Sequence, residues 1–244
     1  MTKKMHHSFY ICILFFVSLL FISCATLPVI GKDANLRFKQ KYQIVTVEEK
    51  LDYLDSKIKY PQFENLPELN KRIENTVMSN WKNFKSYSKS EWKDIVALND
   101  RGNTKLPPFE YLVTCEITGT KKIMSILLNT YVFNGGAHGN TTLTTVNYDV
   151  SSKSYINILD ATGMTYNEIS SVCREQLYKR LIDNNKAAIP PAEKDSIREM
   201  INTGAFPQAG NFEIFTVDGA RVYAWFEPYS VAPYAYGVQK VQVK

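Results

Sequence analysis

Residues 124–150 read MSILLNTYVF, NGGAHGN and TTLTTVNYDV in turn, two strand-like runs on either side of a glycine-rich loop. Apolar, aromatic and β-branched residues dominate both runs, as they do in paired strands. The loop, residues 134–140, holds three glycines, which allow a close approach of backbone to a ligand and tolerate a positive φ. The stretch therefore predicts two connected strands. Its loop is either a tight connection or a cradle for a ligand.

His138 lies in this loop and is the one histidine beyond residue 23. It can hydrogen-bond neighbouring backbone, contact a ligand, or serve as a catalytic base with a carboxylate such as Asp149 or Asp160. One histidine among scattered acids is a weak metal pattern, because structural zinc sites take several His or Cys ligands. We therefore expect no metal and no cofactor. The candidate ligand-binding residues of the loop are Asn134, Gly135, Gly136, His138 and Asn140.

A second unusual segment, FEPYSVAPYAYG, occupies residues 226–237. Its two prolines restrict the backbone, and each of its three tyrosines offers an apolar ring with a polar tip. The segment is therefore either a preorganised aromatic rim or a rigid turn that leads into a last strand. We add Tyr229 and Tyr234 to the candidate ligand-binding residues.

The first residues predict export. Lys3 and Lys4 precede an almost wholly apolar run over residues 9–22, which is the layout of a secretory signal peptide. The run is shorter than the roughly 20 apolar residues that a membrane-spanning helix needs. The ending LFISC at residues 20–24 resembles a bacterial lipobox, so we expect cleavage before Cys24 and lipidation of its thiol. An ordinary signal peptide with an incidental Cys24 is the alternative.

These features divide the chain into three expected parts. Residues 1–23 form the signal peptide, and residues 24–35 hold the lipidated cysteine and a polar tether. Residues 36–244 form a folded domain. The protein is then exported, and its acyl chains anchor it to a membrane of the bacterial cell envelope.

Charge and motifs narrow the function. The 24 acidic residues nearly balance the 29 basic ones and no basic run appears, so we expect no nucleic-acid partner. The motifs G-x-S-x-G, H-E-x-x-H, C-x-x-C and G-x-x-x-x-G-K-[ST] are absent from the sequence. The sequence therefore offers none of these catalytic motifs.

Beyond Cys24, the cysteines are Cys115 and Cys173. Cys115 alternates with apolar residues in a strand-like run, and Cys173 lies on the apolar stripe of a predicted helix, so both point toward a core. They can pair as a disulfide in an oxidising compartment, or they can remain two buried free thiols.

The remaining patterns predict the α+β class, an antiparallel sheet packed with a few helices and preceded by a cleaved lipoprotein signal peptide. Apolar residues recur at helical spacing from Leu69 to Phe84, with Pro67 near the start, and a weakly patterned polar stretch follows to Lys105. The dipeptide Asp218-Gly219 is a strong hairpin signal. Extended structure is expected near residues 41–59, 109–118, 122–133, 141–150, 154–158, 211–217, 221–226 and 236–243, and further helices near 166–183 and 191–202.

Several motifs resemble a bacterial family of unknown function. They are YVFNGGAHGN at 131–140, NYD at 147–149, ILD at 158–160, FEPYSVAPYAYG at 226–237, and YPQF at 60–63 ahead of a long helix. The family occurs in the extracytoplasmic part of the lysozyme-responsive anti-sigma factor RsiV and in the N-terminal region of the peptidoglycan deacetylase PdaC. The resemblance spans roughly residues 42–243.

The resemblance implies an extracytoplasmic recognition domain, because the anti-sigma factor binds lysozyme directly. We expect this chain to lack both the sigma-binding segment and the deacetylase domain. It is then a binding lipoprotein without a catalytic role, whose partner is a cell-wall glycan such as peptidoglycan or a wall-degrading enzyme such as lysozyme. The alternative is a cell-wall or glycan hydrolase that uses His138 and a carboxylate. A structural envelope lipoprotein without a specific ligand is the third hypothesis.

Overall fold

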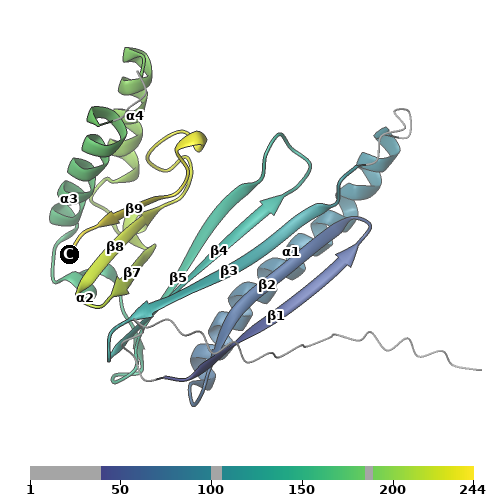
Figure 1. Ribbon diagram of the computed structural model, residues 1–244, viewed down its shortest axis with the longest axis horizontal. Helices are drawn as coiled ribbons and strands as arrows, with labels where there is room; N and C mark the ends of the chain where they lie inside the picture. The colour runs from purple at the N-terminus through teal and green to yellow at the C-terminus, as the bar shows by residue number, and fades with distance from the viewer. Residues whose placement is uncertain (1–39, 100–105, 185–188) are drawn as a thin grey trace, which may run out of the picture.

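The structure, a computed structural model, describes residues 40–99, 106–184 and 189–244 (Figure 1). The predicted signal peptide, Cys24 and the whole tether to residue 35 lie outside these ranges. Two sheets are present among the described residues: a six-stranded sheet in the order β1-β2-β3-β4-β5-β6 and a three-stranded sheet in the order β7-β8-β9. In this part of the chain, no helix has the length and apolar character needed to cross a membrane.

The elements follow one another along the chain without an internal repeat. The strands are β1 (Tyr42–Leu51), β2 (Leu54–Phe63), β3 (Phe109–Gly119), β4 (Ile123–Phe133), β5 (Asn140–Asp149), β6 (Ser154–Tyr155), β7 (Phe215–Asp218), β8 (Arg221–Phe226) and β9 (Gln239–Gln242). The helices are α1 (Pro67–Asn99), α2 (Ile158–Thr162), α3 (Tyr166–Tyr178), the π-helical η1 (Lys179–Asp183), α4 (Pro191–Gly204), and the 3-10 turns η2 (Ala209–Phe212) and η3 (Tyr234–Tyr236).

The prediction of a wholly antiparallel sheet is wrong at one pair of strands in the larger sheet. β1 and β2 form a hairpin in which Leu51 pairs with Leu54. α1 then carries the chain back across the sheet, so β3 runs parallel to β2, with Leu54 opposite Phe109. A parallel pair requires such a crossover, because the chain must return to the end of the sheet from which it started. The mixed α+β class is confirmed, with a mostly antiparallel sheet.

α1 is longer than the periodicity predicts. Leu69, Ile73 and Val77 are buried as expected, but the helix continues to Asn99 through the polar stretch. Trp92 helps to hold this second half, because its ring meets the ring of Phe109 edge-on at a centroid distance of 5.7 Å. Tertiary packing of this kind stabilises helices whose own apolar pattern is sparse.

α1 lies along one face of the larger sheet (Figure 1). The C-terminal unit, from α2 to β9, contacts β3, β4 and β5 through β7. Met124, Ile126 and Leu128 alternate along β4 and pack into a core with α1. The opposite face carries polar side chains that bind the backbone of β7: Val217 N donates to Ser125 Oγ at 2.8 Å, and Asn147 Nδ2 donates to Phe215 O at 2.9 Å. The C-terminal helices and the small sheet enclose a separate core of their own.

Cys115 and Cys173 belong to these two different cores and are free thiols. The disulfide alternative is therefore wrong for this structure, because the larger sheet separates the two residues. Burial raises the pKa of Cys115 to about 11 and that of Cys173 to about 12. Both thiols stay protonated and unreactive near neutral pH.

The predicted hairpin is confirmed in the C-terminal unit, but three predicted boundaries of helices and strands differ from those in the structure. Asp218 pairs with Arg221 across the turn, and Gly219 has a φ of 62°. The strand expected from residue 211 begins at Phe215, because η2 precedes it, and the last strand begins at Gln239, after η3. Ile158 opens α2 instead of ending a strand.

Candidate functional site

Two glycines shape the loop between β4 and β5. Gly135 has a φ of 87°, and a Cβ there would come within 3.3 Å of Phe109 Cε1. Gly139 is packed so tightly that a Cβ would lie 2.2 Å from the ring of Tyr131. Both glycines are thus explained by the geometry of a tight connection between the strands.

His138 stacks on Tyr234, so the two segments singled out in the sequence meet in space. Their ring centroids are 3.9 Å apart and the ring planes are inclined by 20°. Tyr234 Oη donates to Gly139 O at 2.8 Å, and His138 Nδ1 lies 2.9 Å from the same carbonyl oxygen. One backbone carbonyl of the loop therefore orients both rings.

Tyr229 extends this stack into an aromatic cluster, by which we mean His138, Tyr229 and Tyr234. The Tyr229 ring lies 5.6 Å from that of Tyr234, and the residue is 55% exposed. It also has a φ of 69°, a conformation that few residues other than glycine adopt without cost. The exposed ring of Tyr229 is available to stack on a ligand.

The remaining loop residues surround the cluster without joining it. Asn134, Gly136 and Asn140 are exposed. A Cβ at Gly136 would meet only His138 O, at 3.9 Å, so this glycine is not required by packing. Their role in ligand binding stays a prediction.

The carboxylates proposed for a hydrolase are not beside His138. Asp149 ends β5, a ten-residue strand that spans about 30 Å, and its Oδ1 accepts from Ser151 N and Ser152 N. Asp160 forms the capping box of α2 with Asn157. Both acids organise local backbone, and within the described residues no cluster of three or more metal-ligand side chains occurs.

A groove that the sequence did not indicate runs between α1 and the sheet; its volume is about 390 Å³. We call it the threonine groove. Its polar side chains are those of Asn80, Asn83, Tyr87, Thr130, Thr142 and Thr144, and its apolar floor comes from Phe84, Tyr111 and Val132. Thr130 pairs with Thr142 across β4 and β5, so the hydroxyls gather on neighbouring strands.

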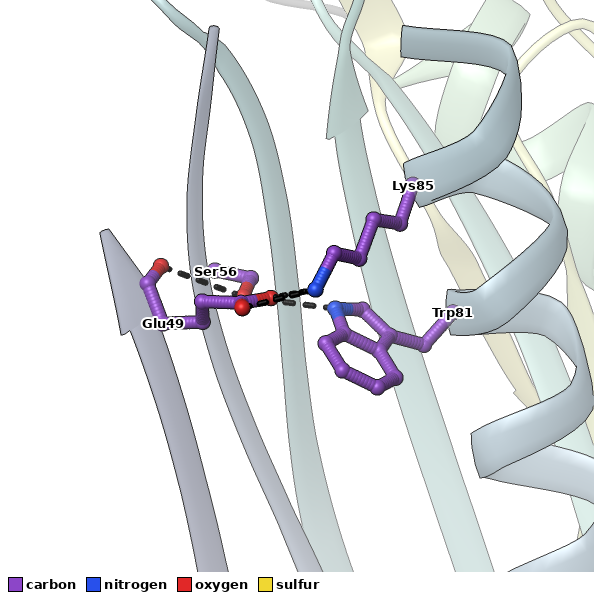
Figure 2. Close-up of polar contacts among 4 residues, drawn as sticks. All are labelled: Glu49, Ser56, Trp81 and Lys85. Atoms are coloured by element: carbon purple, nitrogen blue, oxygen red, sulfur yellow. Dashed lines mark hydrogen bonds and ion pairs between the residues drawn. The ribbon is translucent and has the colours of Figure 1, made fainter. Parts of the chain in front are cut away.

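A polar cluster on the neighbouring stripe of α1 joins this helix to β1 and β2 (Figure 2). Lys85 Nζ forms an ion pair with Glu49 of β1 at 2.6 Å, and Trp81 Nε1 donates to Ser56 Oγ at 3.3 Å. Ser56 Oγ in turn donates to Glu49 O. The cluster ties the β1–β2 hairpin to α1, and it holds the helix in the rotation that turns Asn80, Asn83 and Tyr87 into the groove.

A larger hollow of about 480 Å³ lies beside α3. Two of its lining side chains bond to α4: Arg174 Nη2 donates to Asn202 O at 3.2 Å, and Tyr178 Oη donates to Asn202 Oδ1 at 2.7 Å. These bonds join α3 to α4. The buried Arg174 Nε has no hydrogen-bond partner among the described residues.

Two family models match the chain one after the other. Residues 47–141 match the family described as "Deacetylase PdaC", and residues 161–244 match the family described as "Protein of unknown function (DUF3298)". Each match covers less than half of the chain, so the two families describe what two consecutive segments resemble. We call residues 47–141 the PdaC-like segment and residues 161–244 the DUF3298-like segment. His138 belongs to the first and Tyr234 to the second, so the aromatic cluster lies where the two meet.

One curated relative is the peptidoglycan-N-acetylmuramic acid deacetylase PdaC of Bacillus subtilis strain 168. It is 28% identical over 127 residues, which are 51% of this chain and 25% of the relative. The chain thus spans about a quarter of that protein. The resemblance to a family shared with the PdaC N-terminal region is confirmed.

Two solved structures of DUF3298 family proteins share the fold. One, from Pseudomonas aeruginosa PAO1, has a TM-score of 0.57 and 13% identity, over 85% of this chain and 92% of its own. The other, from Bacteroides fragilis NCTC 9343, has a TM-score of 0.57 and 14% identity, over 85% and 91%. At these identities the likeness shows the fold alone.

Proposed function

We propose that this chain is an exported, lipid-anchored protein of the bacterial envelope that binds peptidoglycan and catalyses no reaction. The observation that carries the proposal is the stack of His138 on Tyr234, with the exposed ring of Tyr229 beside it. Rings held in this way lose little freedom on binding, so they recognise a ligand at low entropic cost. The similarity to a protein named for its action on peptidoglycan supports the choice of ligand.

The positions of the carboxyl groups agree with binding better than with hydrolysis. A glycosidase of the usual kind needs two carboxyl groups on either side of the scissile bond. Asp149 and Asp160 are engaged with backbone elsewhere, and Glu227 Oε1 accepts from Leu143 N. The lipid on Cys24 would keep the bound protein near the envelope.

Sedimentation with insoluble peptidoglycan at physiological salt tests the proposal. The full chain, purified in mild detergent, is expected to bind saturably, and His138→Ala and Tyr234→Ala are expected to weaken binding about tenfold, as loss of an aromatic anchor does. Tyr155→Ala is the control, because Tyr155 is also exposed but lies on β6, outside the cluster. Absence of binding by the unaltered chain would refute the proposal.

The same preparation separates the two other hypotheses. Lysozyme, offered in place of peptidoglycan, tests the expectation of a wall-degrading enzyme as the partner. Release of soluble saccharide from peptidoglycan, lost in His138→Ala, would indicate a hydrolase instead.

A further inference from the structure

One face of the larger sheet changes character halfway along β4 and β5. Met124, Ile126 and Leu128 are buried under α1, but the next positions on the same face are Thr130 and Val132, which are only half-buried. α1 continues alongside without covering them, and the threonine groove lies in this interval. Here Thr130, Thr142 and Thr144 offer hydroxyl groups beside the apolar side chain of Val132.

We infer that the threonine groove binds a neutral saccharide chain. The inference rests on the proposed function for the general class of ligand, and it adds a binding site outside the aromatic cluster. The volume of about 390 Å³ is at the lower end of ligand pockets in proteins, which suits a few sugar units of a longer chain.

Among the residues that the structure describes, no Asp, Glu, Lys or Arg side chain lines the groove. Burial raises the pKa of Tyr111 to about 12, so this phenol is neutral as well. A charged ligand would lose hydration here without gaining an opposite charge, which is costly. A neutral polar ligand is therefore favoured over an anionic or cationic one.

The polar side chains of the groove are free to bind. Asn80, Asn83, Thr130, Thr142 and Thr144 make no side-chain hydrogen bond to another residue in the ranges that the structure describes. Each amide and each hydroxyl can both donate and accept. Sugar hydroxyls and acetamido groups also do both, so the match does not depend on protonation.

An aromatic ring completes the set. Tyr87 is 45% exposed at the rim of the groove, and its ring lies 6.3 Å from that of Phe84, which in turn lies 5.2 Å from that of Tyr111. The apolar face of a pyranose ring can stack on such a surface while its hydroxyls reach the amides and threonines. Tyrosine suits this place because it combines an apolar ring with a polar tip.

Calorimetric titration of the full chain in mild detergent with the pentamer of N-acetylglucosamine tests the inference. Saturable binding is expected, and Tyr87→Ala and Asn83→Ala are each expected to weaken it about tenfold. Tyr155→Ala is the matched control, since Tyr155 is 42% exposed and lies outside the groove. The fully deacetylated, cationic pentamer is expected to bind at least tenfold more weakly than the neutral one.

Unchanged affinity in Tyr87→Ala and Asn83→Ala would overturn the inference, as would equal affinity for the two pentamers. If the full chain sediments with peptidoglycan but ignores the neutral pentamer, the inference fails and the proposed function stands. If it binds neither, both fail.

Discussion

The ring of His138 lies on the ring of Tyr234, with 3.9 Å between their centroids, and this contact joins the PdaC-like segment to the DUF3298-like segment. The carbonyl of Gly139 holds the pair in place, because it accepts from Tyr234 Oη. The two segments are also tied by Ser125, whose Oγ accepts from Val217 N. Asn147, which lies between the two segments, donates to Phe215 O. The aromatic cluster thus exists only when both segments are folded and docked.

The stack predicts that ring shape, rather than basicity, matters at position 138. His138→Phe keeps an aromatic ring and is expected to retain peptidoglycan binding. His138→Ala loses the ring and is expected to lower the free energy of unfolding by less than about 1 kcal/mol, because aromatic pairs contribute about 0.5–1.5 kcal/mol and this residue is exposed. Urea unfolding and sedimentation measure the two effects. Loss of binding in both variants would point to the imidazole nitrogens.

Gly139→Ala is expected to destabilise the fold by about 1–3 kcal/mol, because its Cβ would overlap the ring of Tyr131. Gly136→Ala is the matched control and is expected to leave the free energy of unfolding nearly unchanged. Shortening the obstructing side chain in Gly139→Ala/Tyr131→Leu should recover part of the loss. Additive effects in the double variant would show that the overlap is not the cause.

Lys85→Met is expected to lower the free energy of unfolding by about 1 kcal/mol, because it leaves the Glu49 carboxylate without its cation in a partly screened position (Figure 2). The side chains of this pair are 32% and 26% exposed. The pair of Lys57 and Glu48 has the same 2.6 Å separation but is 50% exposed on both sides, so Lys57→Met is the control. Its removal is expected to change the free energy of unfolding little. Equal effects of the two variants would contradict the account.

Alkylation should distinguish free buried thiols from a disulfide. Burial raises the folded-state pKa of Cys115 to about 11 and of Cys173 to about 12, above the usual value of 9. Folding favours the protonated form of both thiols. Their contribution to the free energy of unfolding is therefore fully present below pH 9, and it is lost as the pH rises through 11 to 12. At pH 8 the native protein is expected to react slowly at both positions, as mapped by mass spectrometry, and the unfolded protein quickly without a reductant. Unfolded protein that reacts only after reduction would indicate a disulfide.

Much of the sheet could be predicted from the sequence. The strand character of β4 and β5, which are rich in apolar, aromatic and β-branched residues, and the hairpin at Asp218 and Gly219 both follow local rules, and the structure confirms them. The parallel pairing of β2 and β3 could not be predicted, because it depends on where α1 returns the chain. The second half of α1 was missed because contacts such as that between Trp92 and Phe109, and not a dense apolar stripe, hold it to the sheet.

The candidate sites, too, could be predicted only in part from the sequence. The glycine-rich loop and the tyrosine-rich segment each attracted attention by composition, but only the fold brings His138 onto Tyr234. The threonine groove was missed because threonine is an ordinary strand residue. A signal did exist: Asn80, Asn83 and Tyr87 recur along one stripe of a helix, at the spacing usually taken by core residues.

Hydrogen exchange of the full chain, with and without soluble peptidoglycan fragments, would show where the protein binds this ligand. We expect slower exchange in residues 80–87, 130–144 and 226–237, the segments that form the threonine groove and the aromatic cluster. The hollow beside α3 should be unaffected. Unchanged exchange throughout, or protection confined to α3 and α4, would contradict the claim that this chain recognises peptidoglycan at these sites.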